Sequence, residues 1–566
     1  MGQCQFCGSV MSSKVRYCSN CGKPVQASAV ASKEGRLGSG FPDGHSARLM
    51  GTLPSGSGRT EGKTERPNAV SIDAISHTLF VVPQHFSNSM LEILNSFGVQ
   101  AVGIVHDANS SSLVGKCQSA LRNSPSGAIR FVCIVGSWDE VPPIRVVNDL
   151  IDDGDAFCLS DAFYGAPEEF NPADPLTAIP DIAVGRIPVA DRTIVQRVLA
   201  REPDVEASLD SFLFGVTAEC WKAATAAIVS SFSNLSKGSP IDLLPGDADT
   251  LPKSVILSSP RWTEESLRQS VGSGPTDAFG LILFNVHGSP DETHWVGEGQ
   301  DGYVQIFQPN TVANFNSAFL ISEACYGGAM SYDTPSIVEQ FFENGGQSFV
   351  GSSTIAYGAP STPISAADLI ARHYVNGLYG GLSQGESLKV AKMEALAEDP
   401  LSIEIGLKTV LSFNLFGAPW QPLLREHTTS RPGSQMNSIM SAPSGSVLSR
   451  VRGSLSAPIS SNNDTVKKFR DQYRSRLPLL NRQFMVEREN VLTKLREFRD
   501  FSKIRDEVRV WGGILEDSKM DFVSAGEAEG YRLFCHTMPT SKSKRTLVLS
   551  INKSGQLTKT VTSKGE

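Results

Sequence analysis

The sequence predicts an α/β fold in which a mostly parallel β-sheet is flanked by helices. Short apolar, β-branched runs alternate with segments of helical periodicity through the middle of the chain. These runs lack the apolar–polar alternation of a strand with one face in water, so both of their faces are expected to be buried. Strands of this kind, alternating with helices, are typical of parallel sheets that carry helices on both sides.

The elements follow one another between residues 78 and 397. Strands are expected at residues 78–83, 101–106, 130–135, 212–218, 281–286, 318–324 and 348–351. Helices are expected at residues 89–97, 113–122, 223–232, 336–344, 366–378 and 385–397. Because ligands bind beyond the carboxyl ends of the strands in such sheets, we expect the functional site where these strands end.

Two stretches rich in serine and glycine divide the chain. Residues 25–70 and 428–462 have no apolar period and cannot bury enough apolar surface to offset the entropy cost of ordering. Both are predicted to be flexible linkers. The remaining parts are a small N-terminal module, two α/β subdomains of one body and a C-terminal module, at residues 1–24, 71–205, 206–427 and 463–566.

The C-terminal module is predicted to combine basic helices with an antiparallel β-meander. Helical periodicity covers residues 464–475 and 481–505. Strands separated by polar turns are expected at residues 508–515, 531–537, 546–552 and 556–562. No catalytic constellation is visible in this module, which favours a role in regulation or interaction.

Charge is distributed unevenly along the 566 residues. The net charge of −8 divides into +5 for residues 1–70, −23 for residues 71–427 and +10 for residues 428–566. We therefore expect the C-terminal module to dock on the acidic body and to restrain it until the linker is released or cut. Basic helices that face solvent, or an external acidic partner, are the alternative. The acidic body argues against nucleic acid as a partner.

The composition gives no sign of a membrane partner. No run of about 18 apolar residues occurs, so a membrane-spanning helix is excluded. The first residues lack the basic and apolar regions of a secretory signal. A cytoplasmic protein is expected.

Four cysteines near the N-terminus have the spacing of a metal site. Cys4 and Cys7 form one Cys-x2-Cys pair, and Cys18 and Cys21 form a second. Four thiolates complete a tetrahedral shell, which predicts one structural Zn²⁺ per chain, held in a zinc ribbon. Two disulfides are the alternative, which an intracellular compartment disfavours.

Two strand ends carry the residues best suited to catalysis. The strand at residues 281–286 runs into His287, and the strand at residues 318–324 runs into Cys325. Neighbouring parallel strands would bring the thiol and the imidazole to the same edge of the sheet, and a cysteine nucleophile needs a nearby imidazole. Either residue alone is more often structural, as a buried core cysteine or a satisfied histidine. The pair points to nucleophilic catalysis.

Several segments form an ordered set of motifs within residues 75–425. They read RFVCIVGSWDEVPP, LSDAFYG, PDIAVGRIPV, VTAEC, LFNVHGSPDETHW, SEACYGG, VGSSTIAYGAP and LFGAPWQPL. Together they resemble the gingipain-type cysteine peptidases, within the wider caspase-like fold group. The His-Gly and Ala-Cys elements recur across caspase-like peptidases, whereas GRIPV and LFGAPWQPL are more specific to gingipain-like chains. The resemblance implies a caspase/gingipain-like body.

The resemblance also implies a role for individual residues. Cys325 would be the nucleophile, His287 the general acid/base, and Glu219 the acidic residue near the histidine. Backbone N–H groups of Gly288 and Cys325 would hold the oxyanion. Thiolate attack on the scissile carbonyl would give an acyl-enzyme, which water hydrolyses.

The chain is therefore expected to be an intracellular cysteine endopeptidase acting on protein or peptide substrates, including basic ones. A regulatory protein could bind the zinc ribbon or the C-terminal module. The alternative is a catalytically inactive peptidase-like scaffold, or a protein that binds nucleic acid or another partner.

Specificity for arginine is not implied, because the sequence departs from the arginine-specific gingipains at the first specificity pocket. Residues 221–225 contain no counterpart of the pocket aspartate, and Tyr357 and Gly358 stand where a pocket tryptophan is expected. An acidic cluster before AFYG could bind Ca²⁺ or a basic substrate, a solvated loop being the alternative. Its members are Asp152, Asp153, Asp155 and Asp161.

Overall fold

The computed structural model divides the chain into two compact units, Met1–Lys63 and Thr64–Glu566. In the first unit it describes a short antiparallel pair, β1 (Gly2–Gln3) and β2 (Val10–Met11). Overall, the structure describes residues 2–3, 10–11, 69–99, 102–106, 113–125, 128–148, 151, 153–168, 174–200, 213–233, 241–242, 255–267, 281–290, 294–299, 302–308, 319–330, 336–399, 403–423, 460–474, 483–485, 488–511, 515, 518–524, 530–537 and 545–564.

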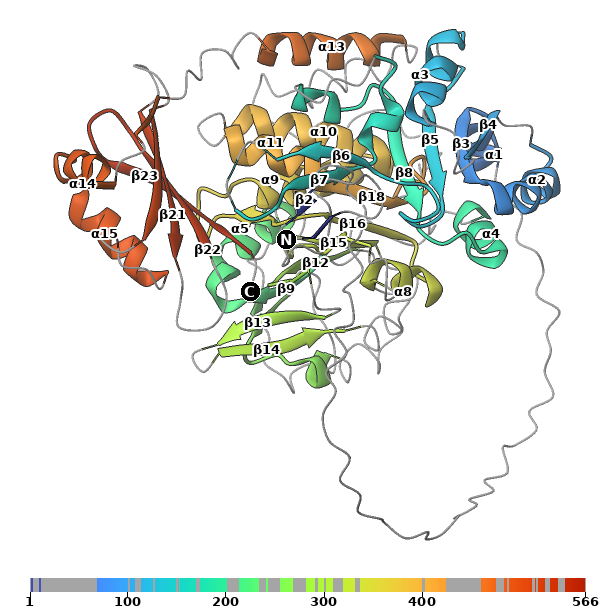
Figure 1. Ribbon diagram of the computed structural model, residues 1–566. Helices are drawn as coiled ribbons and strands as arrows, with labels where there is room; N and C mark the ends of the chain where they lie inside the picture. Colours follow the sequence, from blue (N-terminus) through green and yellow to red (C-terminus); the bar gives the residue numbers. More distant parts are fainter. Residues whose placement is uncertain are drawn as a thin grey trace, which may run out of the picture. The chain divides into compact units, whose positions relative to one another are not determined.

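An eleven-stranded sheet forms the centre of the second unit (Figure 1). Its strand order is β10-β11-β9-β12-β15-β16-β18-β8-β5-β3-β4. In chain order the strands are β3 (Thr78–Pro83), β4 (Val102–His106), β5 (Phe131–Val135), β8 (Ala183–Ile187), β9 (Leu213–Ala218), β10 (Ile241–Asp242), β11 (Val255–Ser259), β12 (Leu281–Asn285), β15 (Phe319–Ser322), β16 (Ser348–Ser352) and β18 (Phe413–Gly417).

Neighbouring strands are parallel except for β16 and β18, which run antiparallel. This confirms the predicted mostly parallel sheet. The seam divides the sheet into two halves of opposite direction, so β9, β12, β15 and β16 end at one edge and β18, β8 and β5 end at the other. Because β18 pairs with β8, one sheet runs through both predicted subdomains of the body.

Helices cover both faces of this sheet, and the alternation of side chains along β12 shows why. Ile282 and Phe284 belong to a core cluster that includes residues of α1 (Ala69–Ser76), α2 (Ser87–Ser96), α4 (Arg192–Ala200) and α8 (Ile337–Glu343). Leu281 and Leu283 belong to a second cluster, with residues of α5 (Lys222–Ser233), α9 (Ala367–Tyr379) and α10 (Gln384–Glu398). Successive residues of a strand point to opposite faces, so β12 is buried on both. On the β3–β5 half, α3 (Leu113–Asn123) packs in a cluster with Leu79 and Val132.

Two hairpins lie outside the large sheet. One consists of β6 (Ile144–Val147) and β7 (Phe157–Ser160), and the other of β13 (Trp295–Gly299) and β14 (Gly302–Phe307). The second hairpin is attached next to β12, because His287 and Val296 form an antiparallel bridge. The helix α11 (Ile403–Ser412) leads directly into β18.

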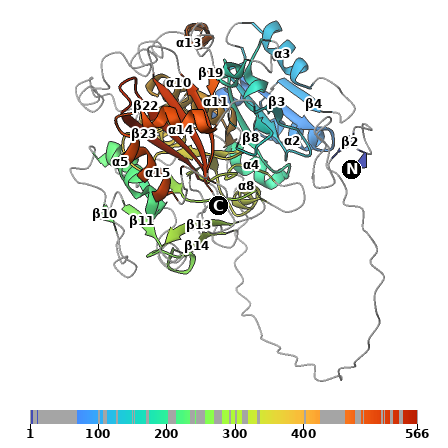
Figure 2. The same ribbon diagram turned by 60° about the vertical axis from the view of Figure 1, so that its left-hand side comes forward.

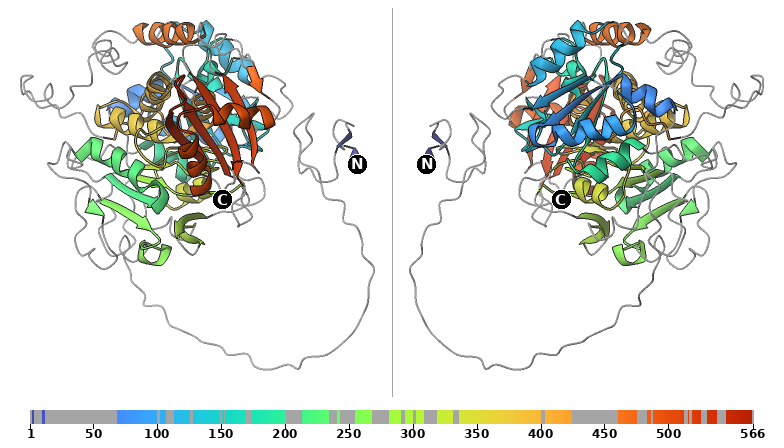
Figure 3. Two further views of the ribbon diagram at one scale, coloured as in Figure 1. Left: turned by 90° about the vertical axis from the view of Figure 1, so that its left-hand side faces the viewer. Right: turned by 90° about the vertical axis from the view of Figure 1, so that its right-hand side faces the viewer.

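The C-terminal region forms a six-stranded antiparallel sheet in the order β17-β23-β22-β21-β20-β19. Figures 2 and 3 show this sheet and the helices packed on it to one side of the large sheet. Its strands are β17 (Tyr357–Gly358), β19 (Gln483–Met485), β20 (Lys519–Ser524), β21 (Tyr531–Thr537), β22 (Arg545–Ile551) and β23 (Leu557–Ser563). The helices of the region are α13 (Ser460–Arg474), which lies apart from the sheet, α14 (Arg488–Arg496) and α15 (Phe501–Val510). Because β17 comes from the body, the two sheets are joined through its pairing with β23.

Buried ion pairs hold the C-terminal region on the body. Arg470 contacts Asp181 with Nη2 2.8 Å from both carboxylate oxygens, and Arg532 contacts Glu404 with Nη1 2.8 Å and 2.9 Å from its two oxygens. All four side chains are at most 6% exposed. The C-terminal region therefore contacts the acidic body through ion pairs that are shielded from water.

Parts of the predicted C-terminal structure are wrong. Residues 508–515 were expected to form a strand, but α15 continues to Val510, because Ile504 and Val508 are four residues apart and face the core whereas Val510 is 76% exposed. The single helix expected at residues 481–505 is divided into β19, α14 and the first part of α15. The ends of both predicted linkers are helical, in α1 and α13, and the rest of the linkers lies outside the described residues.

Among the residues that the structure describes, no helix is both long and apolar enough to cross a membrane.

Candidate active site

The strands that precede the two predicted catalytic residues are neighbours. β12 and β15 pair in parallel, with Phe284 opposite Ser322, and the N–H of Glu323 donates to the carbonyl of Phe284 at 2.8 Å. Just beyond the strands the backbones approach closely, because a Cβ at Gly288 would lie 2.2 Å from the carbonyl oxygen of Cys325. Only glycine fits there. The prediction that both segments reach the same edge of the sheet is confirmed.

Cys325 is buried against the loop that follows β16. Its side chain is 1% exposed, and its Sγ accepts the N–H of Ala356 at 3.2 Å. The next residue, Tyr326, has a φ of 55°, and its N–H donates to Thr354 O at 2.9 Å. Burial raises the pKa of the Cys325 thiol to about 12, and the Ala356 N–H offsets this only in part. In this state the sulfur is a thiol at neutral pH.

His287 is completely buried between aromatic rings and a carboxylate. Its ring lies 4.4 Å from that of Trp221 and 5.0 Å from that of Tyr303, measured between centroids. Its Nε2 is 3.1 Å from Oε2 of Glu298. This hydrogen bond places the imidazole proton on Nε2 and leaves Nδ1 as the basic nitrogen.

Glu298 is an anion that orients His287. Burial alone would raise the pKa of Glu298, but the hydrogen bond from His287 and the charge of Arg545 lower that pKa to about 2. Arg545 Nη2 is 3.1 Å from Glu298 Oε2 and 3.1 Å from the hydroxyl of Tyr303. A residue of β22 in the C-terminal sheet therefore contributes to the surroundings of the histidine.

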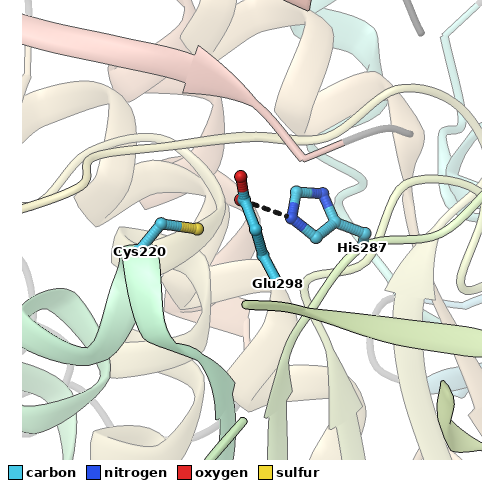
Figure 4. Close-up of side chains that lie close together, drawn as sticks. All are labelled: Cys220, His287 and Glu298. Carbon is cyan, nitrogen blue, oxygen red and sulfur yellow. Dashed lines mark hydrogen bonds and ion pairs between the residues drawn. The ribbon is translucent and has the colours of Figure 1, made fainter. Parts of the chain in front are cut away.

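A second thiol, that of Cys220, reaches the same carboxylate. Ligand atoms of Cys220, His287 and Glu298 lie within 4.8 Å of one another (Figure 4). Such a donor set could hold a divalent transition metal. However, Arg545 already places a positive charge on Glu298, and burial together with the Glu298 charge raises the pKa of Cys220 well above its usual value. The arrangement is that of a neutral thiol and a guanidinium that hydrogen-bond an anionic carboxylate.

Glu219 has other neighbours in the structure. Its Oε2 accepts a hydrogen bond from Ser258 Oγ, and Lys222 Nζ lies 3.7 Å from Oε1. Its side chain is 49% exposed. The carboxylate hydrogen-bonded to His287 is Glu298, which the sequence analysis did not single out.

One predicted oxyanion donor is engaged by the chain itself. The N–H of Gly288 donates to the carbonyl of Lys564 at 3.3 Å, and the N–H of Lys564 donates to Ala356 O at 2.9 Å. Lys564 directly follows β23, and its side chain reaches Asn285 at the end of β12.

The acidic residues considered as a Ca²⁺ site are paired with cations of the chain. Asp153 and Asp155 contact the ammonium of Lys408, and Asp161 binds the Arg186 guanidinium through both of its oxygens. Asp155 also accepts the hydroxyl of Tyr326 and the N–H of Ile355, so it supports the segments on either side of Cys325. Asp152 and the four zinc-site cysteines lie outside the described residues.

Glu298, Arg545 and Lys564 are the functional neighbours that sequence reasoning missed. The β13–β14 hairpin folds back and brings Glu298 to His287. The local sequence, Gly-Glu-Gly, does not indicate that the hairpin folds back in this way. Arg545 and Lys564 arrive from more than 240 residues away. The only sequence signal for Arg545 and Lys564 is the excess of positive charge near the end of the chain, and net charge does not say where in the fold a residue lies.

A thiol and an imidazole at adjacent strand ends of a mostly parallel, helix-covered sheet are typical of cysteine-type peptidases of the caspase-like kind. Residues 113–423, more than half of the chain, match the model of peptidase family C25, so the chain belongs to this family and is a cysteine-type peptidase. The resemblance found in the sequence is thereby confirmed.

Two solved structures are similar to this chain. One is the Arg-specific cysteine proteinase gingipain R (RGPB), with a TM-score of 0.45 and 11% identity over 64% of this chain and 79% of that chain. The other is the complex of Porphyromonas gingivalis RgpB pro- and mature domains, with a TM-score of 0.43 and 13% identity over 62% of this chain and 80% of that chain. No curated protein sequence matches.

Proposed function

We propose that this peptidase is an endopeptidase with Cys325 as nucleophile and His287 as the proton-transfer residue. The observation that carries the proposal is the close approach of Gly288 to Cys325 at the ends of the paired strands β12 and β15. It places the two residue types that acyl transfer through a thiol requires at one edge of the sheet.

The proposed reaction has two halves. His287 takes the proton of the Cys325 thiol, the thiolate adds to the scissile carbonyl carbon, and the resulting oxyanion accepts hydrogen bonds from the backbone N–H groups of Gly288 and Cys325. The intermediate collapses when the carbon–nitrogen bond breaks, and the leaving amine takes a proton from the His287 imidazolium. Water then adds to the thioester with His287 as base, and the carboxylic acid leaves as the Cys325 thiolate is restored.

Glu298 acts through His287 as a positioning residue. Its negative charge fixes the orientation of the ring and stabilises the imidazolium that forms during proton transfer. The ion pair with Arg545 and the hydrogen bond from Cys220 hold this carboxylate in place.

Hydrolysis of a peptide library by the full chain, with and without a thiol-alkylating agent, tests this proposal. We expect cleavage that alkylation abolishes and that Cys325→Ala lowers by about a thousandfold or more. Cleavage that persists in Cys325→Ala would reject the assignment of the nucleophile. If neither the folded full chain nor its Lys564→Ala variant cleaves any member of the library, the inactive scaffold would be favoured.

For the N-terminal unit we propose one structural Zn²⁺ bound by Cys4, Cys7, Cys18 and Cys21. The spacing of the two Cys-x2-Cys pairs supports this. Metal analysis should find one zinc per chain, and Cys4→Ser should lose it. If a chelator that removes the zinc also eliminates turnover of a short peptide, the metal is part of the catalytic machinery and the proposal is wrong.

We further propose that the protein works in the cytoplasm and that a regulatory protein binds its zinc ribbon. The six cysteines in the described residues are free thiols, which suits a reducing compartment. Cell fractionation tests the location, which should be the cytoplasm. Capture of partners by the full chain and by Cys4→Ser tests the second statement, because the variant should lose the partner.

A further inference from the structure

The segment that ends in Lys564 lies along the active site as an added strand. β23 pairs antiparallel with β17, with Ser563 opposite Tyr357. Beyond the last strand residue the pairing continues, because the Lys564 N–H donates to Ala356 O at 2.9 Å. An extended peptide that adds a strand through backbone hydrogen bonds is a common way of binding a substrate-like segment.

The backbone of Lys564 is placed as a substrate residue would be. Its carbonyl accepts the N–H of Gly288 at 3.3 Å, which is one of the two proposed oxyanion donors. The Lys564 N–H and the Cys325 Sγ both hydrogen-bond the backbone of Ala356, which places Lys564 beside the segment of the proposed nucleophile. Lys564 therefore lies between a proposed oxyanion donor and the backbone that holds the Cys325 sulfur, where the substrate residue before the scissile bond is expected to bind.

The side chain of Lys564 fills a pocket built for an ammonium. Its Nζ, which is fully buried, donates to Asp368 Oδ1 at 2.8 Å, to Asn285 Oδ1 at 2.7 Å and to Glu323 Oε2. The ammonium also lies 5.4 Å from the centroid of the Trp221 ring, within reach of a cation–π interaction. These partners come from β12, the residue after β15, α9 and the turn before α5.

The pocket is fixed in advance of its occupant. Asp368 is held by the N–H groups of Ala359 at 2.7 Å and Ser365 at 3.2 Å, both on Oδ2, which leaves Oδ1 for the ammonium. Gly358 leaves the room that the lysine needs, because a Cβ there would lie 2.1 Å from Lys564 Cε. The shape and the charge of the site therefore both match a lysine.

The electrostatics agree with this geometry. Burial alone would lower the pKa of Lys564, but Asp368 and Glu323 outweigh it and keep the ammonium charged. Burial raises the pKa of Glu323 well above its usual value, and Lys564 offsets that rise only in part. Without a cation in the pocket, two buried carboxyl groups would face each other with no countercharge among these contacts.

We propose that the Lys564 segment is a built-in, substrate-like inhibitor, and that the pocket it fills makes the enzyme selective for lysine at the residue before the scissile bond. The inference rests on the proposed function and specifies its substrate class and its regulation. While the segment is bound, an external peptide cannot enter. The burial that keeps Cys325 protonated also makes it a poor nucleophile toward the carbonyl of Lys564.

The first test measures access to Cys325 and does not need peptidase activity. Full-length wild type, Lys564→Ala and Lys559→Ala are treated with iodoacetamide, and the rate of modification of Cys325 is followed by mass spectrometry. Lys559 is a matched control, since it lies on the same strand and forms a buried contact with Asp399, with Nζ 2.7 Å from Oδ2. Lys564→Ala should react on the order of tenfold faster than wild type or more, and Lys559→Ala should not. Equal rates in wild type and Lys564→Ala would overturn the proposal.

A second variant covers the case that Lys564→Ala does not fold. In Lys564→Gln the side-chain amide can still donate to Asp368, but the charge is lost. Circular dichroism checks the fold of each variant. Faster modification of Cys325 in folded Lys564→Gln would support the proposal, and an unchanged rate would reject it.

The second test reads selectivity from peptides that differ only at the residue before the scissile bond, as Lys, Gln or Ala. We expect Lys564→Ala to cleave the lysine peptide faster than wild type does, and to prefer it over the glutamine peptide by about a hundredfold. Equal rates for lysine and glutamine would reject the lysine pocket. Hydrolysis that survives Cys325→Ala in the Lys564→Ala background would reject the proposed nucleophile instead, and would leave the modification result as it stands.

Discussion

His287 is enclosed by Trp221, Tyr303 and Glu298, so the proton it transfers depends on the Glu298 carboxylate bound to its ring. We predict that Glu298→Gln lowers kcat/KM by about a hundredfold, because the imidazolium loses its stabilising charge while the hydrogen-bonding shape is kept. The matched control is Glu219→Gln, the same change at a half-exposed carboxylate bonded to Ser258. A larger loss in Glu219→Gln would show that the carboxylate expected from the sequence is the functional one.

The pH dependence of stability gives Glu298 a second readout. Its pKa is lowered from 4.5 to about 2 in the folded protein, so its contribution to the free energy of unfolding is fully present above about pH 4.5 and is lost as the pH falls toward 2. The difference in stability between wild type and Glu298→Gln should therefore be constant from pH 5 to 7 and should shrink in acid. Denaturant unfolding across this range measures it, and a difference that grows in acid would contradict the assigned charge.

Cys325 and His287 could be predicted from the sequence because each follows a strand that is recognisable by its composition. Glu298 could not, since its place depends on a hairpin that returns to His287 through the bridge with Val296. The partners of the acidic cluster were hidden for the same reason: Lys408 lies some 250 residues from Asp153 and Asp155. Contacts of such sequence separation are decided by packing, which no local pattern reports.

At the scale of elements, the central strands and helices of the body were predictable because they are apolar on both faces or along one helical stripe. The errors fall in the C-terminal region, where α15 has a narrow apolar stripe formed by Ile504 and Val508. Val508 and Val510 are two residues apart, which is the spacing of apolar residues on one face of a β-strand. The seam between β16 and β18 was also missed, since the direction of a strand is not encoded in its own residues.

The contact between β21 and α11 is predicted to hold the C-terminal sheet on the body. Arg532 and Glu404 are both almost fully buried, so Arg532→Ala would leave an unpaired carboxylate. We expect a loss of about 3–5 kcal/mol in the free energy of unfolding, and a recovery of most of it in Arg532→Met combined with Glu404→Leu, which removes both charges. Denaturant unfolding measures both variants. If Arg532→Ala is as stable as wild type, the role given to this pair is contradicted.

At the scale of the whole molecule, the structure changes the expected response to salt. Docking through exposed charges would weaken as salt is added, whereas the pairs formed by Arg470, Arg532 and Lys564 are buried. Screening acts on exposed charges and little on buried ones. Peptide turnover by the full chain should therefore change by no more than about twofold between 0.05 and 0.5 M NaCl. A rise of tenfold or more would show that docking depends on exposed charges.

The central claim is that Cys325, and not the second thiol beside His287, attacks the substrate. Both Cys325 and Cys220 lie near the site, but Cys220 hydrogen-bonds the Glu298 carboxylate, whose negative charge further raises the pKa of the Cys220 thiol. The most direct measurement treats the full chain and Lys564→Ala with a lysine-containing peptidyl acyloxymethyl ketone, and locates the covalent adduct by peptide mapping. The account predicts an adduct on Cys325 that forms faster in Lys564→Ala. An adduct on Cys220 would contradict it.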